Sequence, residues 1–238
     1  MDNAVYTALT RQSGLMTEMR SVANNIANMS TTGYRREGVV FAEHIARLGA
    51  GDPSLSMATA EGHSVDLTPG AMAATGGSLD AAIEGEGFFM VEGQNGNELT
   101  RSGAFTVSPE GALVTVDGRR VLDASGAPIL VPTDAGPVSI ARDGTMAAAG
   151  QPIARLGVFA PVPEASLTRV GNSRFRADGG ETAIEAPTIF QGFLEGSNVD
   201  PVLEITRMIE VQRAYEAGQN LLDAEDQRIR SAVQAMTR

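Results

Sequence analysis

Glycine and proline are distributed so unevenly along this chain that they divide it into three parts. No proline occurs in residues 1–52 or 202–238, whereas 19 of the 27 glycines lie between Gly76 and Gly196. Because proline breaks helices and glycine favours tight turns, the two ends can form long helices while the centre must change direction often. The sequence therefore predicts an α+β chain, with a long helix at each end and an all-β domain between them.

Both ends carry apolar residues at alternating spacings of four and three. A repeat with a period near 3.5 residues is typical of helices that pair in a coiled coil. We therefore expect the two terminal helices to pair as a coiled-coil-like inner domain. The main apolar positions of the two series are Leu9, Met16, Met19, Met208, Tyr215 and Leu222.

Polar side chains interrupt both series, at Gln12, Gln212, Gln219 and Asp226. Such residues set helix register at a cost in stability. Each ordered residue also costs roughly 1–2 kcal/mol of backbone entropy, which two interrupted helices alone would hardly offset. We therefore expect the ends to order fully only in an assembly. The alternative is an ordinary two-helix hairpin within one chain.

Short runs of β-forming residues separated by turns fill the centre. Residues 88–92 and 99–107 flank Asn95-Gly96, a typical hairpin turn, and residues 152–162 read as one longer strand. Residues 49–75 are small, polar and aperiodic, which is typical of an extended connector. We expect four parts: an N-terminal helix (1–33), a connector (34–75), a central β domain (76–193) and a C-terminal helix (194–238).

The charge of the chain argues against nucleic acid as a partner. The net charge is −11, and all 18 basic residues are arginines that form no basic cluster. No run of about 18 apolar residues is present, so we expect no insertion into a membrane. The first residues lack the basic and apolar segments of a cleaved secretory signal peptide, so we expect none.

No pattern in the sequence points to catalysis or to a bound cofactor. The chain has no cysteine, and its two histidines, His44 and His63, lack metal-ligand spacing. The glycine-rich residues 85–89 precede a strand and lack the third glycine and the lysine of phosphate-binding loops. Acidic pairs are abundant, but few aromatic residues accompany them, which argues against a glycosidase. We therefore expect no catalytic residue, no cofactor and no metal.

Four segments, in order along the chain, resemble the axial proteins of the bacterial flagellum, which are the rod and hook proteins. They are residues 23–36 (ANNIANMSTTGYRR), 75–92, 99–129 and 194–227. The opening residues and the length most resemble the proximal-rod type, and next the distal-rod type. A hook protein would be longer, and the short rod proteins lack the β domain.

This resemblance implies a structural, non-enzymatic subunit of the basal-body rod. Its terminal helices would form an inner tube, and the assembled rod would act as the axial drive shaft that transmits motor torque to the hook. Its partners would be copies of itself, short proximal-rod subunits below and the distal-rod protein above. The flagellar type III apparatus would export it, without a cleaved signal peptide, to the periplasmic part of the basal body.

The resemblance also suggests which residues form subunit interfaces. The six apolar positions given above would pack helix on helix, while Gln212, Arg213 and Glu216 would bond across subunits. Three asparagines lie near the end of the first helix, where asparagine is a poor helix former. They would bond backbone groups of the same or a neighbouring subunit, Gly33 would end the helix, and Tyr34 and Arg35 would anchor the turned chain. These asparagines are Asn24, Asn25 and Asn28.

Two alternatives of other classes remain at this point. One is a secreted β-domain binding module on a helical stalk, such as an adhesin. The other is an acidic hydrolase, which would need a cleft with a strongly perturbed carboxylate.

Overall fold

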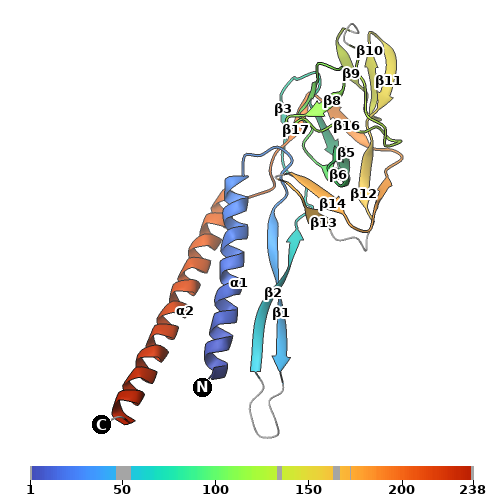
Figure 1. Cartoon of the computed structure of the whole chain (residues 1–238). Coiled ribbons are helices and arrows are strands. Elements are labelled where there is room, and N and C mark those ends of the chain that lie inside the picture. The colour runs from blue at the N-terminus through green and yellow to red at the C-terminus, as the bar shows by residue number, and fades with distance from the viewer. Residues whose placement is uncertain (1, 47–54, 133–135, 163–166, 172, 237–238) are drawn as a thin grey trace. The chain divides into compact units, whose positions relative to one another are not determined.

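The computed structural model describes residues 2–46, 55–132, 136–162, 167–171 and 173–236, and these residues contain two helices (Figure 1). Helix α1 covers Asp2–Ala27 and helix α2 covers Pro201–Met236. Asp200 caps the start of α2: its carboxylate accepts hydrogen bonds from the backbone N–H groups of Val202 (2.9 Å) and Leu203 (3.2 Å). Helix α1 ends at Ala27, six residues before Gly33, the residue expected to end it.

Seventeen strands lie between the helices in the described residues. They are β1 (Glu37–Ala46), β2 (Leu55–Val65), β3 (Met72–Ala74), β4 (Ala81–Glu84), β5 (Phe88–Gly93), β6 (Gly96–Thr100), β7 (Phe105–Val107), β8 (Leu113–Thr115), β9 (Val138–Ile140), β10 (Thr145–Ala148), β11 (Gln151–Arg155), β12 (Val158–Pro161), β13 (Leu167–Arg169), β14 (Arg174–Ala177), β15 (Glu181–Ala183), β16 (Thr188–Gln191) and β17 (Phe193–Glu195).

The chain forms two compact units and passes between them four times. The helical unit consists of Met1–Ala27, Glu37–Asp66 and Asp200–Arg238. The β-rich unit consists of Asn28–Arg36 and Leu67–Val199. The short segment 28–36, which follows α1 directly, therefore belongs to the β-rich unit and not to the helix that precedes it.

Within the helical unit, α1 lies between α2 and a hairpin formed by β1 and β2 (Figure 1). The two strands pair antiparallel from Glu37↔Val65 to Ala46↔Leu55, with a bulge at Val40/Phe41. Strand β2 occupies residues for which the sequence predicts an extended connector. The small residues of β2 do not alternate between apolar and polar as strand residues often do. The strand is recognised only from its pairing with β1.

The expected fold class, with long terminal helices pairing as a coiled-coil-like inner domain, is wrong. Helix α1 is the shorter of the two, at 26 residues against 36, and α2 buries only Glu204 and Val211. Leu9 of the predicted apolar series is 50% exposed, and other large apolar residues of α2 are exposed as well, including Ile205 (51%), Val233 (55%) and Met236 (87%). Polar residues at series positions keep the helices from forming a continuous apolar seam, and the β1–β2 hairpin covers another side of α1.

The β-rich unit is built around a six-stranded sheet with the order β13-β14-β6-β5-β12-β15. A smaller three-stranded sheet (β11-β10-β9) and the pairs β16-β4, β17-β3 and β7-β8 complete it. Their inward side chains form one core, which includes Phe89, Leu113, Met146 and Ile189.

Two details of the β-rich unit differ from the sequence-based expectation. Strands β5 and β6 pair up to Gly93↔Gly96, so the turn residues are Gln94 and Asn95, one position earlier than predicted. The longer strand expected over 152–162 is interrupted between β11 and β12, at Leu156 and Gly157.

Candidate assembly interface

Helix α2 exposes many large apolar side chains, which is unusual for a helix that has no further partner. Scattered exposed apolar residues are normal, but several on one helix mark an interaction surface. They lie on several sides of the helix, and together we call them the apolar face of α2. They are Val202, Leu203, Ile205, Ile209, Leu221, Ile229, Val233 and Met236.

The predicted helix-packing residues fall into two groups. Leu9 is half exposed, whereas Met16 and Met19 are partly buried on α1. Met208, Tyr215 and Leu222 are also partly buried, and their spacing of seven places them on one side of α2. The polar residues predicted to bond across subunits are exposed: Gln212, Arg213 and Glu216. Of these, Gln212 donates to Glu216 (3.1 Å) on the same helix.

Separate polar contacts connect the two helices. The Gln12 amide donates to the backbone carbonyl of Tyr215 (3.2 Å) and accepts from Gln219 (3.0 Å). Further along, Arg207 forms an ion pair with Glu18, and its Nε lies 2.7 Å from the Glu18 carboxylate. The hydrogen bond with Glu18 raises the pKa of Arg207. These contacts fix the register of the helices more than they bury apolar area.

The three asparagines near the end of α1 have different surroundings. Asn25 is fully buried, and its amide donates to the Glu37 carbonyl (2.8 Å) and to the Glu204 carboxylate (3.2 Å). Its carbonyl oxygen accepts from the backbone N–H of Glu37 (3.0 Å). Asn24 is exposed, and Asn28, just beyond the helix, accepts from the Thr31 hydroxyl (3.1 Å). Asn25 thus joins α1, β1 and α2 within one chain.

Gly33 and Tyr34 are internal to the β-rich unit. Gly33 has a φ of +67°, and a Cβ atom there would lie 2.3 Å from the Ser102 nitrogen, so only glycine fits. Its N–H donates to the Glu195 carbonyl (2.8 Å). The buried Tyr34 ring stacks with the Arg169 guanidinium, whose centre is 4.5 Å from the ring centroid.

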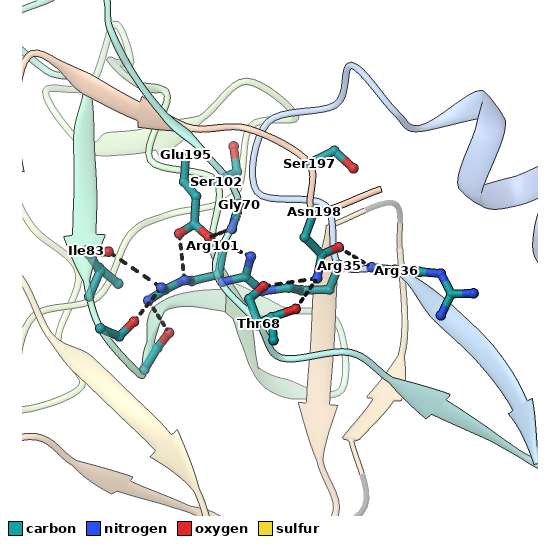
Figure 2. A network of polar contacts seen from close by, with 12 residues as sticks. Arg35, Arg36, Thr68, Gly70, Ile83, Arg101, Ser102, Glu195, Ser197 and Asn198 are labelled. Atoms are coloured by element: carbon teal, nitrogen blue, oxygen red, sulfur yellow. Dashed lines mark hydrogen bonds and ion pairs between the residues drawn. The ribbon is translucent and has the colours of Figure 1, made fainter. Parts of the chain in front are cut away.

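The structure adds a buried ionic cluster that sequence reasoning missed (Figure 2). The Glu195 carboxylate lies 2.5 Å from Arg35 and 2.8 Å from Arg101, and all three side chains are 1% exposed. Burial lowers the pKa of Arg101, which the attraction of Glu195 only partly opposes. No local pattern could reveal this cluster, because its members come from three distant segments of the chain.

Two negative findings apply to the described part of the chain. It contains no group of three or more histidine, cysteine or acidic residues placed to hold a metal ion. Neither of its helices is long and apolar enough to cross a bilayer.

Family models match three parts of the chain. The first, "Flagella basal body rod protein", matches residues 6–35. The second, "Flagellar hook protein FlgE/F/G D1 domain", matches residues 82–148. The third, "Flagellar basal body rod FlgEFG protein C-terminal", matches residues 191–235.

Curated relatives align with nearly the whole chain. The flagellar basal-body rod protein FlgF of Caulobacter vibrioides is 39% identical over 99% of this chain and 98% of its own length. The FlgF protein of Mesorhizobium japonicum is 36% identical, with 91% and 90% covered. The flagellar basal-body rod protein FlgG of Bacillus subtilis is 29% identical, with 98% of each chain covered. By these matches the chain belongs to the FlgF family of flagellar basal-body rod proteins.

Proposed function

We propose that this structural subunit of the flagellar basal-body rod lies in the proximal segment of the rod and transmits motor torque toward the hook. The two FlgF relatives described above are 39% and 36% identical to this chain, against 29% for the FlgG relative. A distal-rod position is the second candidate, because the FlgG relative aligns over 98% of both chains.

The apolar face of α2 is the observation that carries the assembly of this subunit into a rod, and the proximal position rests on the identities given above. A helix that buries two residues out of 36 gains little from packing within its own chain. Burial against neighbouring subunits would remove the exposed apolar area from water. The neighbours are copies of this chain, the short proximal-rod subunits below and the distal-rod protein above. The four-part division predicted from the sequence, with inner-tube helices at 1–33 and 194–238, belongs to the same proposal.

The other interface residues follow from this arrangement. Leu9 and the exposed polar residues Gln212, Arg213 and Glu216 would contact neighbouring subunits. Export would use the flagellar type III apparatus and would place the subunit in the periplasmic part of the basal body. The subunit would act as a mechanical part and not as an enzyme.

Two substitutions in α2 test whether its apolar face drives assembly. Ile229→Asp and Val233→Asp each place a charge on an exposed apolar position, so neither disturbs a buried core. We expect both variants to keep the thermal transition of the β-rich unit but to be missing from purified basal bodies. Gln227→Asp, at an exposed polar position of the same helix, is the matched control and should assemble. Normal incorporation of both apolar-face variants would contradict the proposal.

A tag inserted at the exposed Gln94-Asn95 turn tests the position in the rod. Gold label on purified basal bodies close to the membrane ring would support the proximal segment. Label just below the hook would favour the distal segment.

A further inference from the structure

The buried cluster of the β-rich unit contains one more positive than negative charge. Glu195 faces both Arg35 and Arg101, and backbone carbonyls accept hydrogen bonds from the Nη1 and Nη2 groups of Arg101. Arg101 donates to the carbonyls of Gly87 (2.7 Å) and Gly85 (2.6 Å). Buried charges are costly unless each is paired and hydrogen-bonded. The one carboxylate is therefore the group on which the arrangement of both arginines depends.

Glu195 also holds backbone from two other segments. Its carboxylate accepts from the Gly70 N–H (2.8 Å), and its carbonyl accepts from the Gly33 N–H (2.8 Å). A Cβ atom at Gly70 would lie 2.2 Å from the Gly196 carbonyl oxygen, so the two backbones are in direct contact. Three segments of the chain thus meet at Glu195: residues 28–36, 67–71 and 195–196.

Asn198 adds a second connection between the same segments (Figure 2). Its carbonyl oxygen accepts from the Arg36 N–H (2.6 Å), and its amide donates to the Thr68 carbonyl (3.0 Å). Its backbone N–H donates to the Tyr34 carbonyl (3.3 Å). Arg169 supports this region from β13, because it stacks on Tyr34 and donates to the Arg35 carbonyl (2.6 Å).

These contacts lie close, along the chain, to the points where the chain passes between the two units. The chain leaves or enters the β-rich unit at 27/28, 36/37, 66/67 and 199/200. Arg35 and Arg36 directly precede one crossing, Asn198 lies next to another, and Thr68 follows a third. At the remaining crossing, the Asn28 carbonyl accepts from the Thr31 N–H (3.0 Å), which closes a turn two residues before Gly33. Every connection therefore lies within a few residues of the same contacts.

We propose that Arg35, Arg101, Glu195 and Asn198, which we call the neck cluster, hold all four chain connections of the β-rich unit in one fixed arrangement and carry mechanical load through them. The fixed arrangement follows from the contacts within this unit. The load-bearing role rests on the proposed function in the rod. Glu195 is a positioning residue in this scheme, because it acts by holding the other segments in place.

Hydrogen exchange on the full chain tests the fixed arrangement. Glu195→Gln keeps the shape of the side chain but leaves two buried guanidinium groups without an anion. We expect exchange at least about tenfold faster at the amides of Gly33, Gly70 and Gly196, while amides of β5 and β8 keep their protection. Glu92→Gln is the matched control, because it removes a carboxylate from an exposed ion pair with Arg120 in the same unit. It should change none of these rates.

A second variant, Asn198→Ala, tests the same arrangement and can be used if the Glu195→Gln chain does not fold. This change removes the contacts with Arg36 and Thr68 but leaves no buried charge unpaired. We expect faster exchange at Arg36, with β5 still protected. Unchanged exchange at the connecting segments in both variants, or equal loss of protection throughout the unit, would overturn the neck cluster as a local anchor.

Swimming under load tests the mechanical role. We expect cells with the Asn198→Ala chain to build basal bodies that contain it, to swim in dilute buffer and to slow more than wild type as viscosity rises. Wild-type speed at high viscosity, with the variant present in basal bodies and exchange at Arg36 faster, would overturn the load-bearing role alone. Absence of the wild-type chain from basal bodies would instead contradict the proposed function.

Discussion

Asn25 shows how one side chain can replace a missing strand neighbour. Its amide group matches both the N–H and the C=O of Glu37, as a paired strand would, and a remaining donor faces Glu204. The cost of a residue with low helix propensity at the end of α1 is small beside that of leaving these buried groups without partners. Asn25 thus bonds backbone of its own chain, which is one of the two alternatives that the sequence left open.

Asn25→Asp is the sharpest change at this position, because it keeps the shape and removes both donors. A carboxylate there faces the Glu37 carbonyl and the Glu204 carboxylate, so we expect a loss of about 3 kcal/mol in the free energy of unfolding of the helical unit. Urea titration followed by circular dichroism at the helix band measures it. Asn24→Asp, at the exposed neighbour, should cost less than about 0.5 kcal/mol. Adding Glu204→Gln should restore much of the loss, and additive effects would contradict the contact.

Asp123 offers a pH-dependent test in the β-rich unit. Burial raises its pKa, but hydrogen bonds from Ser125, Ala127 and Gly126 outweigh this and hold the pKa below the ordinary 3.8. Because the folded-state pKa is lowered, the stabilisation is present above pH 3.8 and is lost as pH falls through the folded value. Asp123→Ala should therefore cost about 1 kcal/mol near neutral pH, and less at about pH 3. A cost independent of pH in thermal unfolding would contradict the role of the charge.

At the scale of elements, the sequence predicted those helices and strands whose signal lies in residues close together along the chain. The absence of proline after residue 201 predicted the long helix α2, and the many glycines predicted the β-rich centre. The β1–β2 hairpin was missed because β2 is defined by pairing with β1 and not by its own pattern. The coiled-coil expectation failed because periodicity reports where apolar residues lie on a helix, whereas burial depends on what covers them.

Gly218 explains how α1 and α2 approach each other without an apolar seam. A Cβ atom there would lie 2.7 Å from the Gln12 amide nitrogen, which donates to the Tyr215 carbonyl. Gly218→Ala should gain about 1 kcal/mol of helix propensity but lose a similar amount by displacing Gln12, so we expect little net change. In a Gln12→Ala background the same change should stabilise by about 1 kcal/mol. A double-mutant cycle measured by urea unfolding gives this difference, and additivity would exclude the contact.

At the scale of the whole molecule, the two units differ in what holds them together. The β-rich unit has a continuous core that includes Phe89, Val91 and Leu113, all fully buried. Helix α2 instead buries only Glu204 and Val211 and depends on a few polar contacts with α1. Local stability follows buried apolar area, so the free chain should open first at α2.

Urea titration of the free chain, read by pulsed hydrogen exchange, measures this difference directly. We expect amides of α2 to lose protection at a urea concentration at least about 1 M below that for β5, because less apolar surface must be exposed to release the helix. In purified basal bodies the same α2 amides should be protected, since neighbouring subunits would cover the apolar face. The Ile229→Asp chain, which keeps the β-rich core, should show the early transition of α2 and an unchanged midpoint for β5. A single transition common to α2 and β5 in the free chain would mean that α2 is already stabilised within one subunit, and assembly would then have to be driven by another surface.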